Sequence, residues 1–368
     1  MVRALVVGAG AIGRGFLPWA LEGERIDFFD SSLKLVAEMK DNGGFHTFMS
    51  SKGNLESLFV RPEIVTGNMS DLTLTDYDVA FVAVGPRNVG SVPAELASLE
   101  CPIFSLENDP ETVNVLSNAL GGKDVYFGVP DVITSSTASE ENLKLDRLSL
   151  HTEDGVLYLE DSSAVPDALR GNLKKVEWVR PDQLRVEWDA KLYLHNTPHC
   201  VAAYLGFLAG NEYVHEGFED EFIKDAVSGV IQEMLAALKF STSHNHEFMD
   251  SYAEKELRRF ANPLLFDPIL RVAREPLRKL QVDGRLTGAL RLALTTGVEP
   301  YNLMLGISAA LDYTEEKDRD FELMKRVTSF GVSNFLKYHL DIDTNSIESK
   351  YIARNFNAAS GFIKRGIQ

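Results

Sequence analysis

Cysteine is nearly absent from this chain of 368 residues, which contains only Cys101 and Cys200. Two cysteines in separate contexts provide neither a disulfide framework nor a four-ligand zinc site. Long apolar runs are also missing, since the longest one, at residues 200–210, is too short to cross a bilayer. The first residues reach a glycine after a short apolar run, unlike a signal peptide. We therefore expect a cytoplasmic protein without disulfide bonds.

Positively charged residues are also few relative to acidic ones. The chain has 37 Lys and Arg residues against 54 Asp and Glu residues, a formal net charge of −17. Such a field repels nucleic-acid phosphates and anionic lipid headgroups, so we expect neither nucleic acid nor a membrane as a partner. A small anionic substrate is compatible with this net charge if a few arginines are concentrated at its binding site.

The length is suited to about two domains, and two kinds of pattern divide the chain. Short β-rich runs at residues 4–7, 26–29, 79–84 and 103–106 alternate with helical patterns, which indicates a doubly wound parallel sheet. Residues 44–65 are predicted to form an inserted hairpin pair. Between residues 148 and 179 the apolar period is two, and Asp154-Gly155 predicts a turn that joins two antiparallel strands.

Beyond residue 181 the pattern becomes helical. Helices are predicted at residues 192–210, 219–238, 246–260, 267–280, 285–296 and 318–339. The sequence therefore predicts an α/β, doubly wound domain at residues 1–185 and a mainly α-helical domain at residues 186–368.

A Gly-x-Gly-x-x-Gly motif, Gly8 to Gly13, directly follows the first apolar strand. Gly8 permits a tight turn, Gly10 lets the backbone approach a pyrophosphate, and Gly13 allows close packing of helix on strand. Asp30 ends the second β-rich run, where a carboxylate can accept hydrogen bonds from a ribose diol and would repel a 2′-phosphate. We therefore predict that the first domain is Rossmann-like and binds NAD rather than NADP.

Further cofactor contacts are predicted at Ile12, inside the motif, and at Gly85 and Pro86, after the run 79–84. Ligands of doubly wound sheets bind at the carboxyl ends of the strands, which is where Gly85 and Pro86 fall. A plain turn that ends the strand explains Val84-Gly85-Pro86 equally well.

A nicotinamide enzyme also needs a group that accepts or returns the hydroxyl proton of its substrate. Zinc is disfavoured, because the two cysteines lack a ligand cluster and His244-x-His246 has no evident third ligand. A Tyr-x-x-x-Lys couple at Tyr313 and Lys317 lies in a polar segment, and we interpret it as a chance match.

The strongest candidate is the segment with Lys191, His195, Asn196 and His199. At about 100° per residue these four polar groups share one helix face, spread over about 140°. A lysine in a partly desolvated pocket near a positive nicotinamide has a lowered pKa and can act as a base near neutrality. Pro198 removes one helical hydrogen bond and is expected to kink the helix or mark its start. Helix-start lysines and histidines are also common without catalysis.

These motifs resemble the mannitol dehydrogenase family of polyol-specific long-chain dehydrogenases. The resemblance extends from residue 4 to about residue 310. It includes the glycine motif, the Lys191-x4-Asn196-x2-His199 spacing, Arg259-Phe-x-Asn262-Pro, and the arginine-rich segment 271–280.

The resemblance implies a zinc-independent NAD enzyme that interconverts a polyol and a ketose, with no metal site. It implies that Lys191 is the general acid and base, and that Asn196 and His199 position and polarise the reacting oxygen. It also implies that Asn108 stabilises the oxyanion. The family precedent favours a monomer.

A phosphorylated substrate would need cations, and the chain concentrates four of them at Arg271, Arg274, Arg278 and Lys279. On one continuous helix the three arginines would form a stripe, although Pro276 lies among them. Ion pairs with nearby acidic residues explain this cluster of cations equally well. The residues predicted to bind substrate are Arg259, Asn262, Arg274 and Arg278.

The resemblance, together with these cations, implies mannitol 1-phosphate and fructose 6-phosphate as the substrates. Asp131-Val-Ile-Thr-Ser-Ser stands where the family usually has Val-Asp-Arg-Ile, so two alternatives within the class remain. These are a reductase of keto-hexuronates such as tagaturonate or fructuronate, and a dehydrogenase of free polyols. An alternative from another class is a non-catalytic NAD-binding sensor.

Overall fold

The computed structural model describes residues 1–173, 175–241 and 245–367. The chain forms two compact units. Unit 1 consists of Met1–Glu187 with the short segment Leu264–Phe266, and unit 2 consists of Trp188–Pro263 with the chain from Asp267 onwards.

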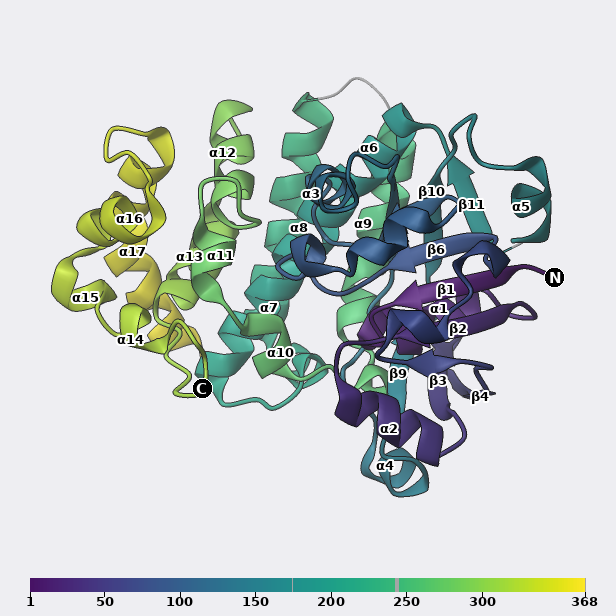
Figure 1. Cartoon of the computed structure of the whole chain (residues 1–368). Coiled ribbons are helices and arrows are strands. Elements are labelled where there is room, and N and C mark those ends of the chain that lie inside the picture. Colours follow the sequence, from purple (N-terminus) through teal and green to yellow (C-terminus); the bar gives the residue numbers. More distant parts are fainter. Residues whose placement is uncertain (174, 242–244, 368) are drawn as a thin grey trace. The chain divides into compact units, whose positions relative to one another are not determined.

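Unit 1 is built on an eight-stranded sheet whose strand order is β11-β10-β8-β7-β6-β1-β2-β5 (Figure 1). The strands are β1 (Arg3–Val7), β2 (Arg25–Phe29), β5 (Val65–Thr66), β6 (Val79–Val82), β7 (Ile103–Ser105), β8 (Tyr126–Asp131), β10 (Val156–Glu160) and β11 (Val176–Val179). Neighbouring strands are parallel except β8 and β10. The sequence prediction of a doubly wound α/β fold is confirmed.

The interior strand β1 is buried on both faces from Ala4 to Val7, which explains why these four residues are all apolar. Ala4 and Val6 pack into one core cluster, whereas Leu5 and Val7 pack into the other. The helices of unit 1 are α1 (Leu17–Ala20), α2 (Leu33–Asp41), α3 (Thr112–Ala119), α4 (Glu140–Leu145) and α5 (Asp167–Asn172), with α6 (Pro181–Ala190) leading into unit 2.

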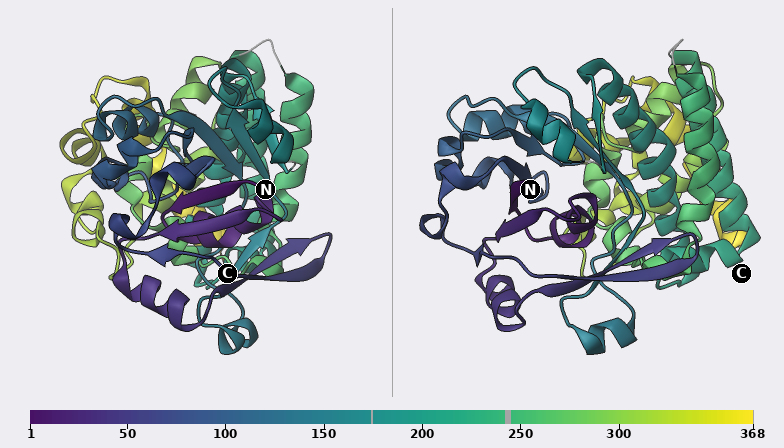
Figure 2. Two further views of the ribbon diagram at one scale, coloured as in Figure 1. Left: turned by 45° about the vertical axis from the view of Figure 1, so that its right-hand side comes forward. Right: turned by 90° about the vertical axis from the view of Figure 1, so that its right-hand side faces the viewer.

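A second sheet has the order β4-β3-β9, formed by β3 (Phe45–Ser51), β4 (Asn54–Val60) and β9 (Leu150–Glu153). β3 and β4 form one antiparallel hairpin, which projects from unit 1 in the left-hand view of Figure 2. The predicted hairpin across Asp154-Gly155 is wrong, because β9 pairs with β3 while β10 pairs with β8. The Asp154 amide donates to Ser50 O at 3.0 Å, so this turn carries the chain from one sheet to the other.

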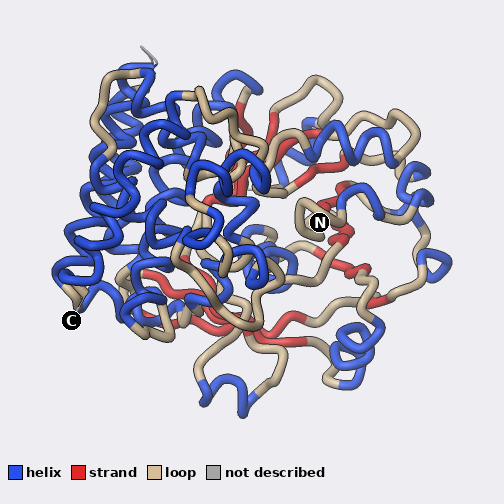
Figure 3. The backbone as a smooth tube through the Cα atoms, turned by 90° about the vertical axis from the view of Figure 1, so that its left-hand side faces the viewer, coloured by secondary structure: helices blue, strands red, loops and turns tan. Residues whose placement is uncertain are grey.

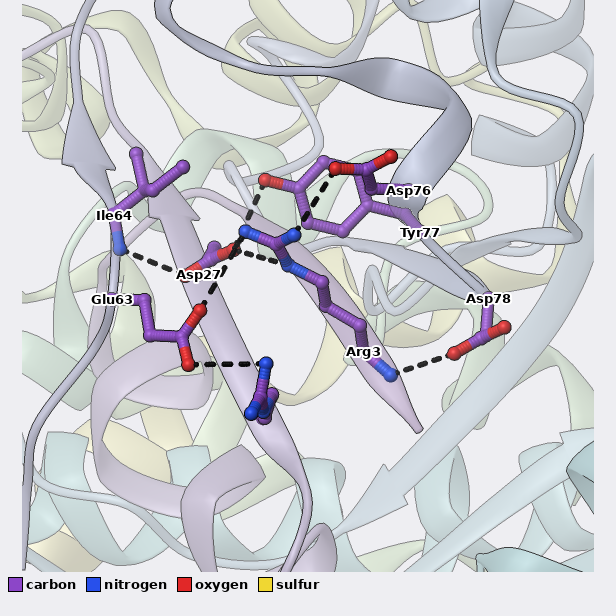
Figure 4. Close-up of polar contacts among 8 residues, drawn as sticks. Arg3, Asp27, Glu63, Ile64, Asp76, Tyr77 and Asp78 are labelled. Atoms are coloured by element: carbon purple, nitrogen blue, oxygen red, sulfur yellow. Dashed lines mark hydrogen bonds and ion pairs between the residues drawn. The ribbon is translucent and has the colours of Figure 1, made fainter. Parts of the chain in front are cut away.

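A polar network lies at the amino-terminal edge of the parallel strands (Figure 4). Its centre is Asp27, which is 1% exposed and accepts hydrogen bonds from Arg3 Nε at 3.0 Å and Tyr77 Oη at 3.1 Å. The other Asp27 oxygen accepts from the Ile64 amide at 2.8 Å. Because doubly wound sheets bind ligands at the opposite edge, we interpret this network as structural.

Unit 2 consists of helices joined by loops (Figure 3). The long helices are α7 (Thr197–Ala209), α8 (Glu221–Ser241), α9 (His246–Phe260), α13 (Tyr301–Leu311) and α17 (Ile347–Gly366). The shorter ones are α10 (Ile269–Ala273), α11 (Pro276–Leu280), α12 (Thr287–Thr295), α14 (Phe321–Met324), α15 (Val327–Phe330) and α16 (Val332–Leu340). In the described residues, no helix combines the length and the apolar character needed to span a membrane.

The predicted helix pattern of unit 2 needs four corrections. The predicted helix 318–339 is divided into α14, α15 and α16, and Gly331 between the last two has a positive φ of 76°. The sequence reading missed α13 and α17, of which α13 is buried along nearly its whole length and so lacks an amphipathic period. The predicted helix 267–280 is broken into α10 and α11. The break lies at Arg274 and Glu275, where Glu275 has a left-handed φ of 59° immediately before Pro276.

Candidate functional site

A cavity of about 320 Å³ opens at the carboxyl ends of β1, β2 and β6. Among the predicted cofactor residues, Gly8, Gly10 and Asp30 line it. Val84, from the candidate turn Val84-Gly85-Pro86, also lines it. The sequence reading missed the remaining lining residues, which are Val7, Phe29, Ser31, Ala83, Asn88, Ser91, Val92 and Pro93. Several of these directly follow strand ends, which is the only sequence signal that could have indicated them.

The three motif glycines are present for different physical reasons. Gly8 has a φ of +101°, and a Cβ there would lie 2.4 Å from the Ala83 carbonyl oxygen. A Cβ on Gly13 would lie 2.1 Å from the Gly8 carbonyl oxygen, so the helix could not pack so closely on the strand. Gly10 has extended backbone and nothing within 4 Å of a Cβ. Neither packing nor conformation therefore requires glycine at position 10, whereas a pyrophosphate lying against this backbone would.

Asp30 is held in a fixed orientation at the cavity wall. Its Oδ2 atom accepts a hydrogen bond from the Ala9 amide at 2.7 Å, and its Oδ1 atom accepts one from the Ser32 amide at 2.8 Å. Each carboxylate oxygen has a second acceptor site, which is available to a ribose hydroxyl. The Lys34 side chain is 86% exposed, and its Nζ atom lies 3.9 Å from Glu38 Oε1. The arrangement fits a nucleotide whose ribose has a free 2′-hydroxyl.

The other predicted cofactor residues lie beside this cavity rather than in its lining. Ile12 packs against the core of unit 1, and Pro86 is exposed. Gly85 has a φ of +88° and donates its amide to Glu107 at 2.7 Å. Asn108, the predicted oxyanion residue, is exposed just after β7, at the same edge of the sheet.

Arg14, inside the glycine-rich segment, has a structural role that sequence reasoning missed. The side chain is buried, and it donates to the Ala9 and Leu148 carbonyl oxygens, both at 2.6 Å. Burial lowers the pKa of Arg14 to about 10, although Asp146 and Asp30 oppose the shift. Arg14 thus fixes the glycine loop to the neighbouring chain of unit 1.

Two π-helices occur at the two segments singled out for function. They span Ala11–Phe16 and Lys191–Asn196, and each is followed two residues later by a proline, Pro18 or Pro198. The Thr197 amide donates to the Leu192 carbonyl, five residues back. A proline ring clashes with the carbonyl four residues back, and a wider turn before it relieves that clash.

As expected, Pro198 lies in the first turn of a helix, α7. However, α7 does not begin a separate helix, because it continues the run from α6 through the π-helix. Lys191 is therefore not a helix-start residue. At about 85° per residue in the π-helix and about 100° in α7, Lys191 and His199 are nearly in line and Asn196 is about 65° away. The π-helix thus narrows the arc that these side chains span.

The proposed proton-transfer residues are buried in unit 2. Lys191 is 3% exposed, Asn196 is 6% exposed and His199 is 7% exposed. The Asn196 Nδ2 atom is buried and has no hydrogen-bond partner among the described residues. Buried polar groups are nearly always satisfied, so an unpartnered amide at this place is expected to donate to a bound ligand.

Each histidine of this segment faces a buried carboxylate that an arginine also contacts. His199 Nε2 lies 3.0 Å from Asp267 Oδ2, and Arg271 Nε donates to Asp267 Oδ1 at 2.7 Å. Burial raises the pKa of Asp267, but Arg271 and His199 outweigh burial and hold it below its ordinary value. Asp267 therefore stays ionised beside His199.

His195 belongs to a parallel arrangement. Its Nδ1 atom lies 2.5 Å from Glu256 Oε2, and the other Glu256 oxygen accepts from Arg259. The Phe260 ring packs against both histidines, with ring centroids 5.3 Å from His195 and 5.0 Å from His199. Arg259, predicted to bind substrate, thus also balances the charge of Glu256.

The predicted arginine stripe is wrong, because the helix is broken between α10 and α11. Arg271 on α10 pairs with Asp267, and Arg278 on α11 donates to Glu275 at 3.0 Å. Arg274 lies at the break and is exposed, and Asn262 is half-buried just after α9. The four predicted substrate residues therefore come from separate local elements of unit 2.

The alternative proton-transfer candidates have different surroundings. The Tyr313 side chain is 1% exposed, and its ring packs against Tyr204 and Phe207. His244 lies outside the described residues. Within the described ranges, no group of three or more His, Cys, Asp and Glu side chains is arranged to hold a metal ion.

Comparison with known proteins gives one consistent result. The family model "Mannitol dehydrogenase C-terminal domain" matches residues 188–327. The chain is 28% identical to the mannitol-1-phosphate 5-dehydrogenase of Thermoanaerobacter pseudethanolicus, over 94% of this chain and 95% of that protein. It is 29% identical to the protein of the same name from Brevibacillus brevis, over 90% of this chain and 92% of that protein.

Solved structures show the same fold. The Pseudomonas fluorescens mannitol 2-dehydrogenase, solved with NAD and D-mannitol, superimposes with a TM-score of 0.78 at 14% identity, covering 99% of this chain and 94% of that one. A D-sorbitol dehydrogenase solved without substrate gives a TM-score of 0.72 at 16% identity, with the same two coverages.

Proposed function

We propose that this chain, a member of the mannitol dehydrogenase family, is an NAD-dependent dehydrogenase that interconverts a sugar-alcohol phosphate and a ketose phosphate. Mannitol 1-phosphate and fructose 6-phosphate are the proposed pair, because the similar curated proteins named above carry that activity in their names. The observation that carries the proposal is the buried Lys191, nearly in line with His199 on a helix segment that also carries the unpartnered Asn196 amide.

The cofactor proposal rests on unit 1. NAD supplies or removes a hydride at the reacting carbon when it is bound. Gly10 leaves room for the pyrophosphate, and Asp30 accepts from the ribose hydroxyls. The Asp30 carboxylate would repel a 2′-phosphate, so we propose NAD rather than NADP.

The proton-transfer proposal rests on unit 2. Lys191 takes the proton from the substrate hydroxyl during oxidation and returns it during reduction. Asn196 Nδ2 donates to the reacting oxygen, and His199 polarises the same oxygen while Asp267 fixes its ring. Removal of such a general base costs about 10²-fold to 10⁴-fold in rate. Asn108 is proposed as a further donor to the oxyanion.

The decisive experiment measures NADH oxidation by the purified chain with fructose 6-phosphate, fructose, tagaturonate and fructuronate. We expect a strong preference for fructose 6-phosphate. Preference for a free ketose or a ketouronate would replace the proposed substrate but retain the dehydrogenase.

Lys191→Met separates an enzyme from a non-catalytic NAD-binding sensor. The variant should lose about 10²-fold or more in kcat and keep its Kd for NADH, measured by fluorescence titration. The matched control is Lys350→Met, which removes an exposed lysine of α17. Equal turnover in both variants would remove Lys191 from the mechanism.

A further inference from the structure

Lys279, the next-to-last residue of α11, is a buried cation without a carboxylate partner. Its side chain is 2% exposed, and its Nζ atom donates to the Arg274 carbonyl oxygen. The ammonium also lies 5.4 Å from the centre of the Tyr204 ring. Within the described part of the chain, no acidic side chain forms an ion pair with Lys279.

A tight turn after α11 brings Arg285 back toward Lys279. The Leu286 amide donates to the Lys279 carbonyl oxygen at 3.0 Å. Thr197 Oγ1 donates to the Arg285 carbonyl oxygen at 2.8 Å, which fixes this turn against the start of α7. The Arg285 side chain is half-buried and forms no hydrogen bond or ion pair with any side chain of the described residues.

The surroundings of these two cations carry more positive charge than negative charge. Burial lowers the pKa of Lys279 well below its usual value, and the neighbouring cations Arg285, Arg278 and Arg274 lower it further. Burial also lowers the pKa of Arg285, with Arg278 and Arg274 contributing again. Two further neighbours, Cys200 and Tyr204, are neutral at pH 7, because burial raises the pKa of each.

The acids of this region are engaged elsewhere. Glu275 faces Arg278 at 3.0 Å and Arg319 at 3.8 Å. Asp318 accepts from the Glu275 amide at 2.9 Å and Asp320 accepts from the Leu277 amide at 3.1 Å, both at the start of α11. Burial and the neighbouring cations disfavour the charged form of Lys279, and a bound anion would favour that form and offset the cost of burying it.

We propose that the Lys279 ammonium and the Arg285 guanidinium together bind the phosphate group of the substrate. This inference rests on the proposed function and adds the residues that distinguish a phosphorylated substrate from a free one. Arg285 is fixed to α7 at Thr197, the residue directly after Asn196, and the Lys279 ammonium lies over the ring of Tyr204 on the same helix.

A phosphate suits this pair better than a carboxylate. It carries a charge of about −2 at neutral pH and three acceptor oxygens, which match two cations with several N–H donors. A carboxylate carries one negative charge and would leave one of the two cations uncompensated.

Lys279→Met is the first test, because methionine has a similar length and no charge. Removing an unpaired buried cation should leave the ligand-free Tm unchanged or raise it. We expect inorganic phosphate to raise the Tm of the wild-type chain, relative to sodium chloride of equal ionic strength, and to have no such effect on Lys279→Met. Retention of the full phosphate effect in this variant would overturn the proposal.

Arg285→Gln and the control Arg258→Gln complete the design, since Arg258 is an exposed residue of α9. The ratio of kcat/KM for fructose 6-phosphate to that for fructose should fall at least tenfold in Arg285→Gln and in Lys279→Met, mainly through KM. It should stay at the wild-type value in Arg258→Gln. A ratio unchanged in both site variants would exclude the site while leaving the proposed function intact.

Failure of the proposed function can also be distinguished from failure of the phosphate site. If the wild-type chain reduces none of the ketoses, but Lys279→Met abolishes stabilisation by inorganic phosphate, the anion site stands and the proposed function is wrong.

Discussion

His199 Nε2 lies 3.0 Å from Asp267 Oδ2, although the two residues come from different segments of unit 2 and neither side chain is more than 9% exposed. The Asp267 carboxylate therefore orients the imidazole that is proposed to polarise the reacting oxygen. A carboxylate that faces one histidine nitrogen also determines which nitrogen carries the proton.

Asp267→Asn tests this positioning role. The amide has nearly the same shape but no charge, so we expect kcat to fall about 10-fold to 100-fold, as is usual when an orienting partner of a functional histidine is lost. If Asp267 is merely structural, the pH profile of kcat should be the same in the variant as in the wild type. If Asp267 positions His199, the acidic limb of that profile should shift in the variant. The exposed Asp225→Asn on α8 serves as the control.

The same carboxylate affects stability in acid. The pKa of Asp267 is lowered in the folded chain, so its contribution is fully present above the unfolded-state pKa and is lost as the pH falls through the folded-state pKa. Between about pH 5 and pH 3 the free energy of unfolding should therefore decline less steeply in Asp267→Asn than in the wild type. Urea denaturation at several pH values measures both slopes, and parallel slopes would contradict the prediction.

Gly10→Ala and Gly13→Ala form a matched pair. A Cβ at Gly10 meets nothing within 4 Å, so the ligand-free Tm should stay within about a degree while the Kd for NADH rises at least tenfold. A Cβ at Gly13 lies 2.1 Å from a backbone oxygen, so that variant should lose about 2 kcal/mol or more of stability. Unchanged NADH binding in Gly10→Ala would mean that the pyrophosphate lies elsewhere.

Asp30→Asn tests cofactor choice. The amide keeps an oxygen for the Ala9 amide but loses the charge-assisted hydrogen bonds to a ribose, which are worth about 1.5–3 kcal/mol each. The Kd for NADH should rise about tenfold or more, and the preference for NADH over NADPH should narrow. If the preference is unchanged, another residue excludes the 2′-phosphate.

Asp27→Ala tests the structural interpretation of the network in Figure 4. The change leaves Arg3 and the Ile64 amide without their buried acceptor, so the free energy of unfolding should fall by about 3 kcal/mol. Turnover of the variant that remains folded should match the wild type. Loss of turnover at full stability would instead assign a functional role to this edge.

The sequence by itself determined the fold class and the cofactor side of the site. Alternating β-rich and helical runs dictate a parallel sheet, and a glycine motif followed by an acidic strand end has meaning only where strand, loop and helix N-terminus meet. These signals are local, so they can be read from neighbouring residues. The resemblance to a family added the choice of His199 over His195, which periodicity alone left open.

Only the tertiary structure decided the rest, because it depends on residues far apart in the chain. The partners Asp267 and Glu256 and the separation of β9 from β10 have no local sequence signal. The π-helix at Lys191 arises where a proline must fit inside a continuous helix that packing holds in place, and periodicity at 100° per residue misplaces its side chains. Local sequence selects the groups that can carry out the chemistry, whereas packing decides which of them meet and which charges remain unpaired.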